Sequence, residues 1–224
     1  MKRPVIIGII VFITLFIGAA FAFAIFQPIK VLPRIRLSPG FAMTDQSGQR
    51  LTNEMLRGSI VVFNYSYTGC TGPCSQGMQT MREIQDALAG YDTGGIPVKL
   101  VTIALNPVID TPAAMLRYAQ EHQAKLDSWH IITMQDTTLL KTIVGGGFEV
   151  YYKANDNGLI ELDPTFTLVD GWGIIRGEYR FNGLTSNSER IMTHIKVLVE
   201  EVHKSVGAAR LAYEAAHLFM CYAP

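Results

Sequence analysis

Short apolar runs alternate along the chain with longer segments in which apolar residues recur at the helical period of 3.6. Runs rich in β-branched and aromatic residues predict strands over residues 41–45, 49–51, 60–66, 98–105, 129–134, 165–169 and 173–180. The helical period predicts helices over residues 75–88, 137–144 and 186–206, and one that starts at Pro112 behind the N-cap Thr111. Helices that alternate with strands, followed by an antiparallel hairpin, indicate a mixed α/β sheet layered by helices.

The N-terminal apolar segment, residues 4–26, contains no charged residue and follows Lys2 and Arg3. As a helix it would measure about 34 Å, enough to cross a hydrocarbon core of about 30 Å. Residues 22–24 also resemble a signal-peptide cleavage site, but signal peptides usually have a shorter apolar region of about 7–15 residues. We therefore expect an uncleaved N-terminal transmembrane helix, with the globular part outside the cytoplasm, in a bacterial periplasm or an equivalent space.

Four segments follow from these patterns. We expect a membrane anchor or signal peptide over residues 1–27, a proline-punctuated linker over 28–40, a globular domain over 41–206 and a helical tail over 207–224. Outside the apolar segment about 190 residues remain, which is enough for one well-buried core. The 19 basic and 19 acidic residues balance, so no basic field is available to hold a nucleic acid.

Two of the three cysteines, Cys70 and Cys74, directly follow the strand predicted over 60–66, in a turn rich in glycine and proline. They stand at the start of the next helix, where backbone N–H groups and the helix dipole favour thiolate over thiol. Thiolates serve both redox chemistry and the binding of soft metals. Two thiols that directly follow the first core strand along the chain indicate a thioredoxin-like architecture. Two structural cysteines, buried or joined in a plain disulfide, are the alternative interpretation.

Several blocks of the sequence resemble the Sco/SenC family, which consists of membrane-anchored, thioredoxin-fold copper proteins that assist the assembly of cytochrome c oxidase. The resemblance covers about residues 37–203, and its blocks follow in the expected order: Pro39-Gly-Phe-Ala-Met-Thr-Asp-Gln-Ser-Gly48, Val61-Val-Phe-Asn-Tyr-Ser-Tyr-Thr-Gly-Cys70 with Cys74, Val101-Thr-Ile-Ala-Leu-Asn-Pro-Val-Ile-Asp-Thr-Pro112, and Phe166-Thr-Leu-Val-Asp170 through Gly173. It implies that Cys70 and Cys74 bind copper. Their C-x3-C spacing also differs from the C-x2-C of ordinary thioredoxins.

One position departs from the family pattern. The family's third copper ligand is a histidine eight residues before the Asp of the late Leu-Val-Asp motif. Counting back from Asp170 gives Leu162, with Asp163 and Pro164 beside it. Two thiolates still suit copper(I), whereas the loss of an imidazole weakens the binding of copper(II) more. The departure puts metal delivery in doubt and favours a thiol-redox role.

The C-terminal tail carries a second set of soft donor groups. His217, Met220 and Cys221 are spaced i, i+3 and i+4, which places them on one face of a helix. Imidazole, thioether and thiolate together form a ligand set suited to copper. We hypothesise that the tail folds back and supplies His217 or Cys221 to the site of Cys70 and Cys74. The alternative is an Ala-rich helix over 207–219 that packs its apolar side chains on the domain or on a membrane.

Other candidate residues have weaker claims. Met78 and Met81 follow the cysteines on the same predicted helix and offer thioether sulfur, although core filling is the simpler role for both. Asp110 and Asp163 are candidates to orient ligands from outside the metal's own coordination, and for Asp110 helix capping is simpler.

Three functions remain compatible with these residues. A metallochaperone would hold copper on Cys70 and Cys74 and pass it to a cytochrome c oxidase subunit or another copper-assembly protein. A thiol–disulfide oxidoreductase would reduce the cysteines of a partner's metal site, with Cys70 attacking if it is the more exposed and Cys74 resolving the mixed disulfide. A peroxiredoxin-like peroxidase has only the T-x-x-C spacing of Thr71 and Cys74 in its favour. We expect the copper-binding assembly factor.

Overall fold

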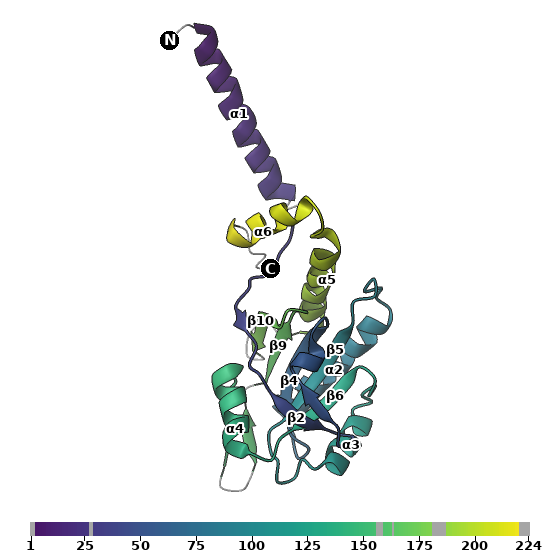
Figure 1. Ribbon diagram of the computed structural model, residues 1–224. Helices are drawn as coiled ribbons and strands as arrows, with labels where there is room; N and C mark the ends of the chain where they lie inside the picture. Colours follow the sequence, from purple (N-terminus) through teal and green to yellow (C-terminus); the bar gives the residue numbers. More distant parts are fainter. Residues whose placement is uncertain (1–2, 27–28, 156–158, 163, 181–186, 220–224) are drawn as a thin grey trace.

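The computed structural model describes residues 3–26, 29–155, 159–162, 164–180 and 187–219, and the side chains of these except residues 19–26, 73–74 and 218–219. The described residues form an eight-stranded sheet with the strand order β1-β10-β9-β4-β5-β6-β2-β3 (Figure 1). Its strands are β1 (Arg36–Leu37), β2 (Ala42–Asp45), β3 (Arg50–Thr52), β4 (Ile60–Ser66), β5 (Val98–Ala104), β6 (Trp129–Thr133), β9 (Thr165–Val169) and β10 (Ile174–Arg180). Strands β4, β5 and β6 run parallel, and the remaining pairings are antiparallel.

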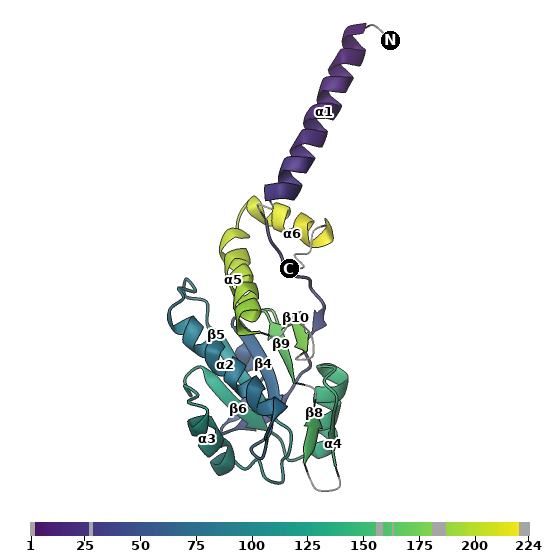
Figure 2. The same ribbon diagram turned by 180° about the vertical axis from the view of Figure 1, so that it is seen from behind.

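Helices cover both faces of the sheet, as Figures 1 and 2 show from opposite sides. One face carries α2 (Pro73–Ala89), α3 (Pro112–Glu121) and α5 (Ser188–Lys204). The other carries α4 (Thr137–Lys141), which continues as the π-helix η2 (Thr142–Gly147). A 3₁₀ turn, η1 (Glu54–Leu56), precedes β4, and the strands β7 (Tyr152–Ala154) and β8 (Ile160–Leu162) form a separate hairpin.

Strand β4 separates two hydrophobic clusters. Its residues alternate between them, as the period of two in a strand requires. Ile60 and Val62 join the cluster beneath α2 and α5, whereas Val61, Phe63 and Tyr65 join the cluster beneath α4 and η2. Every residue of β4 is therefore buried, which explains its continuous apolar run. The predicted thioredoxin-like mixed sheet layered by helices is confirmed.

The N-terminal apolar segment forms the helix α1 (Arg3–Phe26), which projects away from the body of the molecule (Figure 1). Among the described residues no helix is long and apolar enough to cross a membrane. The transmembrane helix that we expected is thus not supported.

Two further segments differ from the sequence-based expectation. The segment expected as a linker contributes β1 to the sheet and buries Val31 and Leu32 completely or nearly so. The helical segment predicted over residues 137–144 continues through the glycine triplet 145–147, which lies within η2. The tail forms a helix, α6 (Ala209–Phe219), after α5.

Candidate metal-binding and redox site

Cys70 lies in the loop that joins the end of β4 to the start of α2. Its backbone N–H donates to the carbonyl oxygen of Tyr67 at 3.0 Å, which closes a turn directly behind the strand. The half-buried side chain of Cys70 packs against the hydrophobic cluster beneath α4. Gly72 follows at the N-cap of α2 with φ +78°, in the left-handed region that favours glycine. Pro73 then begins the helix, and Cys74 is its second residue.

Asp110 ties the cysteine loop to the loop that follows β5. Its Oδ1 accepts hydrogen bonds from the backbone N–H of Thr68 at 2.8 Å and from the Thr68 hydroxyl at 2.7 Å. Its Oδ2 accepts from the backbone N–H of Asn106 at 2.8 Å. The carboxylate is fully buried, and this burial raises the pKa of Asp110 although three hydrogen bonds favour the charged form.

The simpler role predicted for Asp110, capping of α3, is therefore wrong. Thr111 is the N-cap of α3, as predicted, and its side chain accepts from the backbone N–H of Ala114 at 3.3 Å. Sequence reasoning missed the bonds between Asp110 and Thr68. A signal for them was present, because the carboxyl ends of the parallel strands β4 and β5 meet at the same edge of a sheet.

Cys70 is disulfide-bonded in the structure. The side chain of Cys74 lies outside the described residues. Within the described part of the chain, no group of three or more His, Cys, Asp or Glu side chains is arranged to hold a metal ion. At this site the structure shows a cysteine sulfur that takes part in a disulfide bond.

Leu162 lies at the end of β8 and is half-buried. It packs against the same hydrophobic cluster as Cys70, together with Met134 and Tyr152. The position at which the family resemblance expects an imidazole therefore belongs to the apolar surroundings of this cluster. Leucine has no donor atom for a metal. Asp163, the neighbouring candidate, lies outside the described residues.

Met78 and Met81 point into the other hydrophobic cluster, beneath α2 and α5, and both are fully buried. The sulfur of Met78 accepts a hydrogen bond from Nδ2 of Asn64 at 3.5 Å. Both methionines fill the core, which is the simpler role predicted for them. Their thioether sulfurs are therefore not placed as metal ligands.

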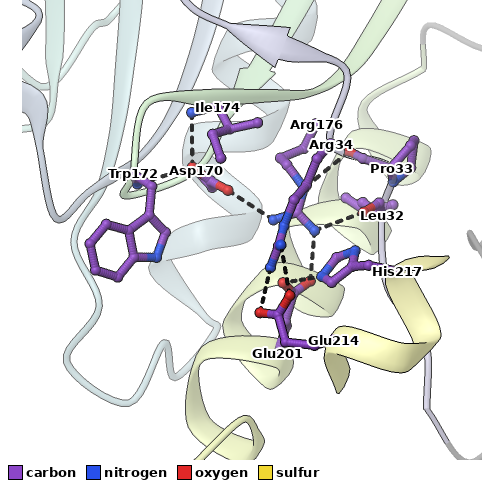
Figure 3. Close-up of polar contacts among 10 residues, drawn as sticks. All are labelled: Leu32, Pro33, Arg34, Asp170, Trp172, Ile174, Arg176, Glu201, Glu214 and His217. Atoms are coloured by element: carbon purple, nitrogen blue, oxygen red, sulfur yellow. Dashed lines mark hydrogen bonds and ion pairs between the residues drawn. The ribbon is translucent and has the colours of Figure 1, made fainter. Parts of the chain in front are cut away.

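His217 does not meet Cys70. Its Nε2 lies 2.9 Å from Oε1 of Glu201, whose Oε2 pairs at 2.8 Å with the buried guanidinium of Arg176. Arg176 in turn pairs with Asp170 at 2.8 Å, and its Nη2 and Nε donate to the carbonyl oxygens of Leu32 and Pro33 (Figure 3).

This charged cluster lies at the opposite end of β4 from Cys70. Asp170 follows β9, next to the start of β4, where the N–H of Gly58 donates to the carbonyl oxygen of Gly171 at 2.9 Å. Cys70 follows the end of β4, and a seven-residue strand is about 20 Å long. The hypothesis that the tail brings His217 to the cysteines is therefore wrong, because Glu201 holds this imidazole elsewhere. Met220 and Cys221 lie outside the described residues.

A mixed sheet with Cys70 in the loop after its central strand β4, and Cys74 in the first turn of α2, defines a thioredoxin-like domain with a thiol-based site. The chain belongs to the SCO1/SenC family, because the model of that family, SCO1/SenC, matches residues 31–200. The family assignment made from the sequence blocks is thereby confirmed.

Known relatives are distant in sequence. A SCO2-like protein of Rickettsia conorii is 25% identical over 131 residues, which cover 54% of this chain and 62% of that protein. The chain thus matches less than two thirds of the length of this relative. BsSco, described with a disulfide switch and as a member of the Sco family of cytochrome c oxidase assembly proteins, has a TM-score of 0.65 at 20% identity and covers 77% of this chain and 98% of its own. Yeast Sco1 with copper bound has a TM-score of 0.60 at 19% identity over 84% of this chain and 100% of its own. These structural likenesses show the fold.

Proposed function

We propose that this protein binds copper through Cys70 and Cys74 and delivers it during the assembly of cytochrome c oxidase. The observation that carries the proposal is the place of Cys70 behind β4, in a chain of the SCO1/SenC family whose structural relatives include a copper-bound Sco1. The receiver would be an oxidase subunit or another copper-assembly protein. A disulfide-bonded cysteine fits a domain outside the cytoplasm, where disulfides persist.

The donor groups fit copper(I) better than copper(II). Thiolates are soft ligands and select copper(I), whereas copper(II) prefers nitrogen and oxygen donors in a square arrangement. Leu162 contributes no such donor, and the surroundings that it shares with Cys70 are apolar. We infer that the disulfide-bonded form must first be reduced to two thiols by a dithiol, which becomes a disulfide in turn. The two thiolates then hold copper(I) and release it when incoming thiolates or imidazoles replace them stepwise.

The test is an anaerobic copper(I) titration of the reduced full chain against a competing chelator. We expect one tightly held copper per chain, which is lost in Cys70→Ser/Cys74→Ser. Cys221→Ser is the matched control because it removes the chain's third cysteine and leaves the proposed pair intact. Equal copper binding by the double variant and the unmodified protein would refute the assignment of the site.

The disulfide bond of Cys70 favours a second candidate function, a thiol–disulfide oxidoreductase that reduces the cysteines of a partner's metal site. Here a thiolate of the reduced protein attacks the partner's disulfide and forms a mixed disulfide, which the second cysteine resolves. The partner gains two thiols and this protein becomes disulfide-bonded. A reduction potential near the −270 mV typical of thioredoxin, together with no competitive copper binding, would favour this function over copper delivery.

A further inference from the structure

An exposed apolar turn lies directly beside the cysteine loop. Val108 is 82% exposed and Ile109 is 42% exposed, although both are β-branched aliphatic residues. Ile109 borders the cysteine loop closely, because a Cβ added to Gly69 would lie 3.2 Å from the Ile109 Cδ1. We call Val108 and Ile109, together with the exposed Gly69, Thr71 and Gly72 of the cysteine loop, the apolar patch.

The backbone holds the two aliphatic side chains in the solvent. The N–H groups of Ile109 and Asp110 both donate to the carbonyl oxygen of Asn106, at 3.0 and 2.8 Å. Asp110 fixes this turn to Thr68 through its buried carboxylate. The position of Val108 and Ile109 relative to the cysteine loop is therefore set by hydrogen bonds, and their exposure is not relieved by a simple rotation of the turn.

Charge is missing from both loops that form the apolar patch. Residues 67–81 contain no charged residue, and residues 106–116 contain only Asp110, in a chain with 17% charged residues. Asp110 is fully buried. A charged partner surface would lose its hydration here without gaining an opposite charge, whereas an uncharged apolar surface would lose little.

We propose that the apolar patch is the docking surface for an uncharged, apolar segment of a partner protein, the segment that carries the thiols exchanging with Cys70. The inference rests on the proposed function in one respect, because either copper delivery or disulfide reduction needs such a partner. Docking on Val108 and Ile109 brings the partner's sulfur next to the Cys70 loop, and the absence of charge selects against acidic or basic cysteine-bearing segments.

The test compares two reductants of the protein's disulfide. The first is a synthetic peptide with two cysteines three residues apart, flanked by Leu and Val, and the second is dithiothreitol. In each case one thiolate attacks the protein's disulfide, the S–S bond breaks, and the second thiol resolves the mixed disulfide. The products are an oxidised reductant and a protein with two thiols. Rates are followed by alkylation of the released thiols and mass spectrometry of the full chain.

We expect Val108→Ser/Ile109→Ser to slow reduction by the apolar peptide about tenfold and to leave the rate with dithiothreitol within about twofold. The matched control is Val202→Ser/Val206→Ser, which replaces two aliphatic residues that are 49% and 65% exposed. This control should change neither rate. A peptide flanked by Lys and Glu should react more slowly than the apolar peptide and should not distinguish the variants.

Three results would overturn the proposal. Unchanged rates with the apolar peptide would show that the patch does not dock it. An equal loss with both reductants would show that the substitutions altered the disulfide itself. Conversion of a dimer to a monomer by the double variant, seen by sedimentation, would make a second copy of this chain the occupant. The double variant should bind copper(I) as tightly as the unmodified protein. If the unmodified protein binds no copper(I), the proposed copper function is wrong, whereas the docking surface is still tested by the reduction rates.

Discussion

Asp110 is the residue on which the position of the cysteine loop depends most directly, because one buried carboxylate serves both Thr68 and Asn106. In Asp110→Asn only one of the two side-chain oxygens remains, so an amide N–H group must face a backbone N–H. We expect a loss of about 1–3 kcal/mol in the free energy of unfolding. Urea unfolding of the full chain measures it, and a change below 0.5 kcal/mol, the size of ordinary surface substitutions, would contradict the role assigned to this carboxylate.

The raised pKa of Asp110 also predicts how the stability effect of Asp110→Asn depends on pH. Burial raises the pKa of Asp110 in the folded protein above its ordinary value of 3.8. A carboxyl with a raised folded pKa contributes stability that is fully present below pH 3.8 and is lost as the pH rises through the folded value. The stability difference between the unmodified protein and Asp110→Asn should therefore be larger near pH 4 than at pH 7. Equal differences at both pH values would show that the carboxyl titrates normally.

Leu162 is the residue that we expect to make the proposed site suit copper(I) better than copper(II). If it stands where the family has its histidine, Leu162→His adds an imidazole to the two thiolates. We expect affinity for copper(II) to rise about tenfold or more, which corresponds to about 1.4 kcal/mol, because imidazole is a ligand suited to copper(II) and leucine offers no donor. Electron paramagnetic resonance and sulfur-to-copper absorption measure the bound copper(II).

Leu159→His is the matched control for Leu162→His, because Leu159 precedes β8 and is 50% exposed. It places an imidazole on the same segment without adding it to the hydrophobic cluster shared with Cys70. A gain of copper(II) in both variants, or in neither, would mean that Leu162 does not adjoin the bound metal.

Elements with a strict hydrophobic pattern could be predicted from the sequence almost to the residue. Strand β4 has the predicted bounds because both of its faces are buried, and α3 begins at the predicted Pro112 because Thr111 caps it. The strand β1 could not be predicted, since its two residues gain their conformation from pairing with β10. In η2 the conformational freedom of three glycines is overridden by the packing of Ile143 and Val144 on the core.

Some residues of the candidate site could likewise be found from the sequence, whereas others depend on contacts between distant parts of the chain. Cys70 and Cys74 could be found from their place behind a predicted strand, because that signal is local. The bond between Asp110 and Thr68 joins residues 42 positions apart and depends on the parallel pairing of β4 and β5. The position of His217 depends on its pairing with Glu201, which in turn pairs with the buried Arg176. The i, i+4 spacing of the tail gives no information about either residue, so this position could not be predicted.

At the scale of the whole molecule, two polar centres lie at opposite ends of β4. The cysteine loop follows its carboxyl end, and the cluster around Arg176 lies at its amino end, where it joins β10, α5, α6 and the segment of Leu32 and Pro33 (Figure 3). Helix α6 adds the pair of Arg34 with Glu214 at 2.9 Å and packs Tyr213 and Ala216 on the buried Val31. The tail thus stabilises the end of the domain at which the chain enters it.

Removal of residues 207–224 tests this separation of roles. The truncation exposes Val31 and deprives Glu201 of His217, so the free energy of unfolding should fall by about 2–4 kcal/mol. Copper(I) affinity should stay within about twofold, because the removed groups that the structure describes lie about 20 Å from the cysteine loop. His217→Gln in the full chain keeps a donor for Glu201 and should retain most of the stability that the truncation loses. A copper affinity that falls with the truncation but not with Cys221→Ser or His217→Gln would instead show that another residue of the tail reaches the site.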